Sequence, residues 1–451
     1  MTSPHQAWAA DQVAAALERI APQVAQRRAG VQPRLRRVLE AFSAERLGVH
    51  HFASVSGYGH GDLGREVLDR VFARVLQAEA AAVRLQFVSG THAIAAALFG
   101  VLRPGDRLLA LTGRPYDTLE EVIGIRGQGQ GSLAEFGVRY DELPLGPDGA
   151  VDEAAMADAL GPATRMVLIQ RSCGYSWRPS LGVAQIGRLV ERVKALQPSC
   201  LVFVDNCYGE LVELQEPTAV GADLMAGSLI KNLGGTIAPT GGYVAGREEL
   251  VEMACCRLTA PGIGREGGTG FDLHRLLFQG LFLAPQMVSE ALLCAELTAA
   301  VFDGLGYAVN PPVGGPRSDV IQAVRFGRPE PLKAVCRAFQ ALEGELVRVG
   351  ITAFAVEQLG DIVFVELPDI GAAISQGSGF GSVESVKAVE DLLAPLSGTV
   401  EARNEAVLAS PEELQNDPHG EGWLLLVRPS DPSQIEALMD ADTYAGKVDG
   451  H

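Results

Sequence analysis

One lysine in this 451-residue sequence stands where solvation alone does not explain a positive charge. The chain has 37 basic residues but only five lysines: Lys194, Lys333 and Lys387 lie in amphipathic, helix-like stretches, and Lys447 lies in a polar tail. Lys231 lies instead in the apolar segment MAGSLIKNLGG, with no carboxylate within five positions. An amine in an apolar site has a lowered pKa and can form a Schiff base with a carbonyl compound. Lys231 is therefore the first candidate for covalent chemistry.

Four further features follow apolar runs of the sequence. After AVRLQFV come Ser89, Gly90, Thr91 and His92, which open an apolar helix. Small residues at a helix N-terminus expose backbone N–H groups that can bind a phosphate, although a simple N-cap looks the same. Tyr116 follows RLLALT and either stacks on a flat ligand or packs in its loop.

Asp205 closes the run CLVFVD, and Lys231 lies 26 residues after it. Ser228 precedes Lys231 by three positions, so the two form a Ser-x-x-Lys pair. A carboxylate at the end of a buried strand needs a partner, such as a pyridinium N–H, Mg²⁺, a ribose hydroxyl or a helix N-terminus. The combined order is a phosphate-binding turn, an aromatic, a strand-end acid and Ser-x-x-Lys. That order predicts a pyridoxal 5'-phosphate (PLP) site, with Ser228 on the phosphate and Lys231 on the aldehyde.

The surrounding elements are of the kind that positions such residues. From residue 66 to about 300, short apolar runs at 82–88, 107–112, 165–170 and 200–205 alternate with helical stretches, which indicates a mostly parallel sheet covered on both faces. Ligands bind beyond the carboxyl ends of such strands. We expect an α/β chain with an N-terminal helical arm (1–48), a large PLP-binding domain (49–300) and a smaller α+β domain (301–451), in which VESVKAVEDLLAPL is a helix.

Composition excludes several classes of function. The formal net charge of −18 disfavours nucleic acid as a partner, because phosphate backbones need clustered Lys and Arg. The apolar stretches are shorter than a membrane span, and the N-terminus lacks the pattern of a signal peptide. Seven scattered cysteines without a CxxC pair indicate reduced thiols and no metal site. We expect a cytoplasmic protein.

Residues 35–325 resemble the methionine γ-lyase family linked to aluminium resistance, in runs such as FVSGTHAIAAALFGVLRPGD, VLIQRSCGYSWRPSL, FVDNCYGELVE and DLMAGSLIKNLGG. The resemblance implies the fold of the type I PLP enzymes, with a seven-stranded sheet, and a homodimer or homotetramer with shared active sites. It also implies roles. Lys231 holds PLP as a Schiff base, and Asp205 keeps the ring nitrogen protonated. The other cofactor contacts are Ser89, Gly90, Thr91, His92, Tyr116, Tyr208 and Ser228, with Tyr58 reaching the phosphate from a neighbouring subunit, while Arg171 and Tyr175 line the substrate side.

The C-terminal third departs from that family. Its runs GFGSVESV and GWLLLVRPSDPSQIEALM are similar to the end of the cystathionine synthase/lyase superfamily. This resemblance places Arg428 on the substrate carboxylate, and Ser378 and Gly379 near a position where those enzymes have Ser.

The predicted function is PLP-dependent elimination or replacement at the γ-carbon of a sulfur amino acid such as methionine, cystathionine or S-adenosylmethionine. Lys231 removes the α-proton, and Tyr116 or His92 assists the proton transfers. Alternatives on the same scaffold are β-elimination, transamination, or C–C bond formation through a vinylglycine-type intermediate. A PLP-binding regulatory protein without turnover is the alternative from another class.

Overall fold

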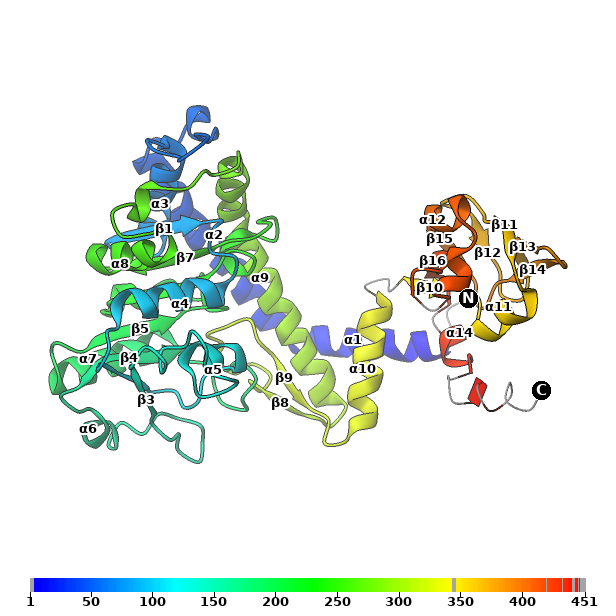
Figure 1. The fold of residues 1–451 in the computed structure, drawn as a ribbon. Helices are drawn as coiled ribbons and strands as arrows, with labels where there is room; N and C mark the ends of the chain where they lie inside the picture. The colour runs from blue at the N-terminus through cyan, green and yellow to red at the C-terminus, as the bar shows by residue number, and fades with distance from the viewer. Residues whose placement is uncertain are drawn as a thin grey trace. The chain divides into compact units, whose positions relative to one another are not determined.

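The structure is a computed structural model that describes residues 4–342, 346–418, 420–431, 433–439, 443–444 and 446. Its contacts divide the chain into two compact parts, Met1–Arg325, here called the large unit, and Phe326–His451, here called the small unit (Figure 1). The expected boundary after residue 300 falls inside a long helix of the large unit, α9 (His274–Gly304).

The large unit is built on one seven-stranded sheet of order β1-β7-β6-β5-β4-β2-β3. Only β7 runs antiparallel to its neighbours, so the sheet is mixed and mostly parallel, as expected. In sheet order its strands are β1 (Ala80–Arg84), β7 (Gly242–Gly246), β6 (Leu224–Ser228), β5 (Leu201–Asp205), β4 (Thr164–Gln170), β2 (Arg107–Ala110) and β3 (Arg139–Glu142).

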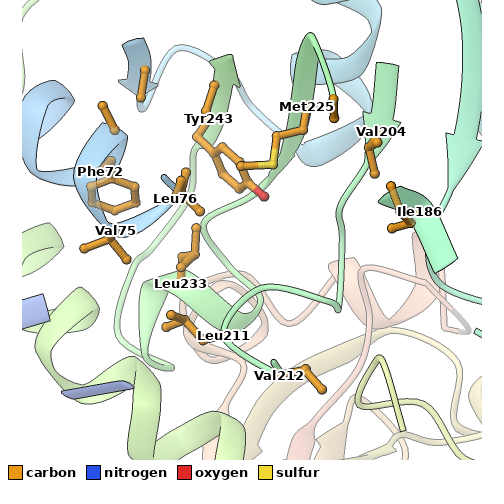
Figure 2. Packing of buried hydrophobic residues seen from close by; sticks show 14 of the residues in the cluster. Phe72, Val75, Leu76, Ile186, Val204, Leu211, Val212, Met225, Leu233 and Tyr243 are labelled. Carbon is orange, nitrogen blue, oxygen red and sulfur yellow. The ribbon is translucent and has the colours of Figure 1, made fainter. Parts of the chain in front are cut away.

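Helices cover both faces of this sheet, because its central strands are apolar on both sides. On β5, for example, Val204 points into one buried cluster and Phe203 into the other. Figure 2 shows part of the first cluster, in which Phe72 of α3 and Leu76, the residue that follows this helix, lie near Tyr243 and Met225 of the sheet. The helices of this unit are α1 (Pro4–Arg19), α2 (Ala21–Ala44), α3 (Leu63–Val75), α4 (Gly90–Val101), α5 (Asp117–Ile123), α6 (Met156–Ala159), α7 (Val183–Leu196), α8 (Glu248–Leu258) and α9.

The N-terminal arm packs on α9. Ile20 and Ala16 lie in a small buried cluster with Ala300, and Arg27 pairs with Glu296 at 3.0 Å. Within the described part of the chain, α9 is also the one helix long and apolar enough to cross a membrane, which the sequence analysis did not expect. Half of that apolar stretch is buried in the fold, as the core of a soluble protein would also have it. The large unit ends with a hairpin of β8 (Ala308–Asn310) and β9 (Ala323–Arg325).

The small unit is a β-sandwich preceded by one amphipathic helix, and the expected α+β arrangement is wrong. One sheet has the order β10-β16-β15-β12 and the other β11-β13-β14, and side chains from both enclose a common core around Val383, Val400 and Val427. The elements are α10 (Pro329–Leu342), β10 (Val347–Val349), α11 (Ala353–Leu359), β11 (Ile362–Glu366), β12 (Ala373–Ile374), β13 (Gly379–Ser385), β14 (Val389–Leu393), β15 (Gly398–Arg403), α12 (Glu405–Ala409), α13 (Glu413–Asn416), β16 (Leu425–Pro429) and α14 (Ser433–Glu436).

Candidate functional site

Three neighbouring parallel strands carry the predicted site residues at one edge of the large sheet. β5 ends at Asp205, which lies opposite Gln170 of β4 and Ala226 of β6 in the strand register. β6 ends two residues later at Ser228, and the chain then turns to Lys231. The carboxyl ends of these strands therefore gather the residues that lay far apart in the sequence.

The N-terminus of α4 lies close to the end of β6, where hydrogen-bond donors for an anion gather. Ser89 caps α4 by accepting a hydrogen bond from the His92 amide at 3.1 Å, so its hydroxyl has a structural partner. The Ser228 hydroxyl is different, because it is buried and has no hydrogen-bond partner. A Cβ atom at Gly90 would lie 3.1 Å from Ser228 Cβ, a tight contact that glycine avoids where the helix N-terminus approaches that serine. Free N–H groups and an unpaired buried hydroxyl are the donors that a phosphate requires.

Asp205 is suited to hold a positively charged ring nitrogen. Its side chain is 3% exposed, and Oδ1 accepts a hydrogen bond from the Cys207 amide at 3.1 Å. Burial raises the pKa of its carboxyl, while the charges of Lys231 and the buried Arg178 act in the opposite direction. A buried carboxylate of this kind gains stability from a cationic N–H, which a pyridinium ring supplies.

Two tyrosine side chains lie beside these residues: Tyr208 contacts the lysine amine, and Tyr116 contacts Thr91 at the N-terminus of α4. Lys231 Nζ lies 3.9 Å from the centroid of the Tyr208 ring. The Tyr116 hydroxyl lies 3.0 Å from Thr91 Oγ1. The backbone N–H of Tyr116 donates a hydrogen bond to Gln170 Oε1 at 3.3 Å. Burial, and next the charge of Asp205, raise the pKa of Tyr116, so its phenol stays protonated at neutral pH.

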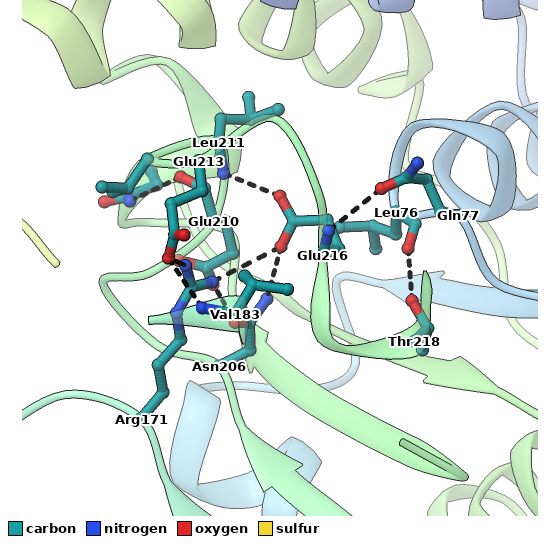
Figure 3. A network of polar contacts seen from close by, with 12 residues as sticks. Leu76, Gln77, Arg171, Val183, Asn206, Glu210, Leu211, Glu213, Glu216 and Thr218 are labelled. Atoms are coloured by element: carbon teal, nitrogen blue, oxygen red, sulfur yellow. Dashed lines mark hydrogen bonds and ion pairs between the residues drawn. The ribbon is translucent and has the colours of Figure 1, made fainter. Parts of the chain in front are cut away.

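The structure does not bring every predicted residue to this site. Arg171 is fully buried and its guanidinium binds Asn206 Oδ1 at 2.8 Å and Glu213 Oε1 at 3.0 Å (Figure 3), which does not support contact with substrate. Tyr175 is 94% and Tyr58 85% exposed to solvent in the single chain. His92 Nδ1 accepts from the Val88 amide at 3.3 Å, and burial lowers the pKa of its ring, which favours the neutral form.

Sequence reasoning missed three buried groups beside the site. Cys207 Sγ lies 3.1 Å from where a Gly90 Cβ would be, and Glu210 and Arg178 are buried close enough to act on the charges of Lys231 and Asp205. For Cys207 and Glu210 the available signal was the run DNCYGE at the end of a buried strand. Within the described ranges no group of three or more His, Cys, Asp and Glu residues is arranged to hold a metal ion.

In the small unit, Lys387 lies at the tip of a hairpin, and the helix expected over VESVKAVEDLLAPL is wrong. β13 and β14 pair antiparallel on either side of Val386, Lys387 and Ala388, all of them exposed. The Ser385 hydroxyl fixes the turn by accepting from the amides of Lys387 and Ala388 at 3.2 and 3.1 Å. Apolar residues at every third position suggested a helix, but the strands bury Val383 and Leu392 from opposite sides of the turn.

Arg428 also lies in the small unit, on β16. Its side chain is half exposed and pairs with Glu401 of the neighbouring strand at 2.8 Å.

A family model described as methionine gamma-lyase matches residues 9–347. The chain belongs to the methionine gamma-lyase family. Its lyase part is 48% identical over 305 residues to YnbB of Bacillus subtilis, covering 67% of this chain and 72% of that protein. It also resembles the structure of a carbon–sulfur lyase involved in aluminium resistance from Clostridium novyi, with 44% identity, a TM-score of 0.71, and coverage of 73% of this chain and 79% of that one.

Residues 336–451 match a second family model, that of the glycine cleavage H-protein. This part is 76% identical over 106 residues to the glycine cleavage system H protein of Parasynechococcus marenigrum, covering 24% of this chain and 82% of that protein. The C-terminal third is therefore an H-protein domain joined to a lyase-family domain. The expected resemblance to the cystathionine synthase/lyase superfamily is wrong, and the roles of Arg428, Ser378 and Gly379 that rested on it lose their support.

The fold of the large unit is that of PLP-dependent proteins. The PLP-dependent protein YhfS of Escherichia coli is 16% identical, with a TM-score of 0.50 over 92% of this chain and 96% of that one, and this likeness concerns the fold alone.

Proposed function

We propose that the large unit is a PLP-dependent carbon–sulfur lyase acting on a sulfur-containing amino acid. The observation that carries the proposal is the placement of Lys231 beside Asp205, with the unpaired hydroxyl of Ser228 at the N-terminus of α4. These groups are the amine, the carboxylate and the phosphate donors that PLP needs. The name of the Clostridium novyi relative supports the choice of carbon–sulfur cleavage.

Each residue then has a defined task. The Lys231 amine holds the cofactor and, when substrate displaces it, takes the proton from the substrate α-carbon. Asp205 keeps the ring nitrogen protonated, and Ser228 and the α4 N–H groups hold the phosphate. PLP itself supplies an electron sink for the charge left on the α-carbon. We assign the proton for the leaving group to the phenol of Tyr116, whose hydroxyl lies 3.0 Å from Thr91 Oγ1.

We propose the γ-carbon as the position of elimination, with β-elimination as the alternative. The test is to incubate the purified full-length protein with methionine, cystathionine, cysteine and S-adenosylmethionine and to measure the released thiol or thioether and the 2-oxo acid. A four-carbon 2-oxo acid from methionine supports γ-elimination, and pyruvate from cystathionine supports β-elimination. Release of neither product from any of these substrates, by protein that shows the absorbance of bound PLP, would contradict the lyase proposal.

We propose a second activity for the small unit: it carries a lipoyl group on Lys387. The observation in its favour is an exposed lysine at the tip of a tight hairpin, inside a segment that belongs to the H-protein family. An exposed amine on a rigid turn is accessible to a modifying enzyme, and a lipoyl group attached to it is free to move in the solvent. The test is peptide mass spectrometry after expression with lipoic acid, with Lys333 on α10 as the internal control. An unmodified Lys387 in cells that lipoylate their other carrier proteins would contradict it.

We further propose that the protein works in the cytoplasm as a homodimer or homotetramer in which Tyr58 completes the phosphate site of a second subunit. Its exposure in the single chain, between glycines of positive φ at positions 57 and 59, supports this arrangement. Light scattering gives the mass of the assembly. A monomer that binds PLP normally would argue against the shared site.

A further inference from the structure

A turn that follows β5, residues 206–211, is held at both ends by one buried carboxylate. Glu216 has no exposed surface. Its Oε2 accepts a hydrogen bond from the Asn206 side-chain amide at 3.1 Å, and its Oε1 accepts one from the Leu211 backbone amide at 2.9 Å. Figure 3 shows these two contacts on the two oxygens of Glu216. Between them, the Gly209 amide donates to the Asn206 carbonyl at 3.0 Å. One side chain therefore fixes the start and the end of the turn.

Two residues of this turn have a backbone conformation that side chains disfavour. Tyr208 has a φ of 70° and Leu211 a φ of 59°, both in the left-handed region that residues with a Cβ atom rarely adopt. Such a conformation persists only where the surrounding contacts impose it. Glu216 provides one of these contacts directly, because it accepts from the Leu211 amide. The turn therefore depends on this carboxylate for its shape.

The same turn contacts the lysine of the proposed cofactor site and the residue after it. The Tyr208 ring lies over the amine, with its centroid 3.9 Å from Lys231 Nζ. The Glu210 backbone carbonyl accepts a hydrogen bond from the side-chain amide of Asn232 at 2.8 Å, and Asn232 directly follows Lys231. A change in the shape of the turn would therefore move the ring relative to the amine.

Two arginines hold Glu216 in turn. Arg171 Nη1 lies 3.6 Å and Arg37 Nη2 3.5 Å from its carboxylate oxygens, and Arg37 belongs to α2 of the N-terminal arm. Arg171 also donates to Asn206 Oδ1 at 2.8 Å. A Cβ atom at Gly209 would lie 2.5 Å from Arg171 Cδ, so the turn lies directly on this arginine. Two cations and two N–H donors thus fix the position of the carboxylate.

We propose that Glu216 is a positioning residue, which keeps the Tyr208 ring against the Lys231 amine by holding both ends of the 206–211 turn. This inference rests on the proposed function, because it takes Lys231 as the lysine that binds PLP. A ring in this place stabilises the charged amine and covers one side of it. Release of the turn makes the amine more reactive in cofactor-free protein and less well placed in PLP-bound protein.

The first measurement is made on cofactor-free protein with the variant Glu216→Gln. Glutamine has one acceptor oxygen instead of two, so one end of the turn loses its hydrogen bond. The rate of Lys231 acylation at fixed neutral pH, measured by peptide mass spectrometry relative to Lys333, should rise about 2- to 30-fold, as loss of a cation–π contact allows. Tyr208→Ala should give a similar rise. The double variant should give no further rise, because both changes remove the same contact.

The matched control is Glu296→Gln. Glu296 also has no exposed surface, and it also pairs with an arginine of the N-terminal arm, Arg27, and with a buried arginine, Arg317, each at 3.0 Å. It lies about 24 Å along α9 from Gly280, where this helix contacts the segment that follows Lys231. The E296Q variant should therefore lose stability as E216Q does and leave Lys231 acylation unchanged. Equal rises in the two variants would mean a general loosening of the fold and would overturn the proposal.

The second measurement is made on PLP-bound protein. E216Q should shift the absorbance maximum of Lys231-bound PLP and lower kcat for each bound PLP by up to about 100-fold, the cost of a misplacement of about 1 Å. If E216Q folds poorly, Asn206→Ala frees one end of the turn, leaves Glu216 with both arginines, and should give a smaller rise in acylation. Unchanged acylation in a folded variant overturns this inference alone. Absence of Lys231-bound absorbance in the wild type overturns the proposed function instead.

Discussion

The two lysines singled out by their surroundings, Lys231 in the large unit and Lys387 in the small unit, are placed in opposite ways. Lys231 is partly buried over an aromatic ring, among groups that shift its pKa and beside a serine without a partner. Lys387 projects from an exposed hairpin whose turn is held by its own serine. One residue type therefore suits two kinds of chemistry: a buried amine suits catalysis, and an exposed amine suits the attachment of a group such as lipoyl.

Replacing Lys231 should produce the largest effect. We expect Lys231→Ala to lose both the absorbance of covalently bound PLP and all turnover of sulfur amino acids, because among the lysines that the structure describes Lys231 alone lies at this strand end. Absorbance spectra and the thiol assay measure the two losses. Lys387→Arg is the matched control and should keep both signals. Full activity in the K231A variant would remove the basis for treating the two lysines as different.

Replacing Lys387 should abolish the other activity without changing the first. Lys387→Arg keeps the charge on the hairpin, but a guanidinium does not form the amide bond that lipoylation requires. Intact-mass measurement should show no adduct, while the rate of carbon–sulfur cleavage should equal that of the wild type. An adduct that persists in the K387R variant would mean that another site is modified.

Arg171 tests whether the large unit depends on its buried ion network, whereas the ion pairs described in the small unit lie at its surface. Arg171→Met leaves Glu213 and Glu216 without their shared cation, and breaking such a buried pair costs about 3–5 kcal/mol of unfolding free energy. Hydrogen exchange measured by mass spectrometry should become faster in β4 and β5 and stay unchanged in β13 to β16. Loss of substrate binding in a variant of normal stability would instead revive the predicted substrate role.

Ser228 should have a smaller effect, confined to the cofactor. Ser228→Ala removes one hydroxyl from a site that also has the α4 N–H groups, and a hydrogen bond to a charged group contributes about 1.5–3 kcal/mol. PLP affinity should therefore fall by roughly 10- to 100-fold, while folding is preserved because the hydroxyl has no protein partner to lose. Fluorescence titration of cofactor-free protein with PLP measures the PLP affinity. Ser89→Ala, the matched control, should lower helix stability through loss of its N-cap contact.

The sequence predicted the large unit well because its signals were local. Short apolar runs marked the strands, and candidate residues lay at or just after the ends of these runs, as Asp205 closes CLVFVD. The predicted substrate role of Arg171 took no account of its buried surroundings, because Glu213 and Glu216, which its guanidinium contacts, lie more than forty residues away in the sequence and become neighbours only through the fold. Glu210 was missed for the same reason: only the packing of Tyr243 and Gly227 around it shows that it is buried without a cation.

The small unit was predicted poorly because a short motif was interpreted without its context. The spacing of Val383, Val386, Val389 and Leu392 fits one face of a helix, yet valine is β-branched and favours strands. Of these four residues only Val383 and Leu392 are buried, one on each strand of the hairpin, whereas Val386 and Val389 are exposed, so the three-residue period does not mark one buried face.

Arg428 should show the smallest effect, and this is the sharpest test of the boundary between the two units. Its exposed pair with Glu401 joins neighbouring strands of the β-sandwich, and exposed ion pairs contribute between about 0 and 1 kcal/mol. Arg428→Ala should therefore change the unfolding free energy by less than about 1 kcal/mol, and the KM for sulfur amino acids should stay at the wild-type value. A carboxylate-binding arginine would behave differently, because removing it leaves the substrate carboxylate without its cation and raises KM strongly. A large rise in KM for the R428A variant would mean that the H-protein domain takes part in lyase catalysis. The proposed separation of roles between Lys231 and Lys387 would then no longer hold.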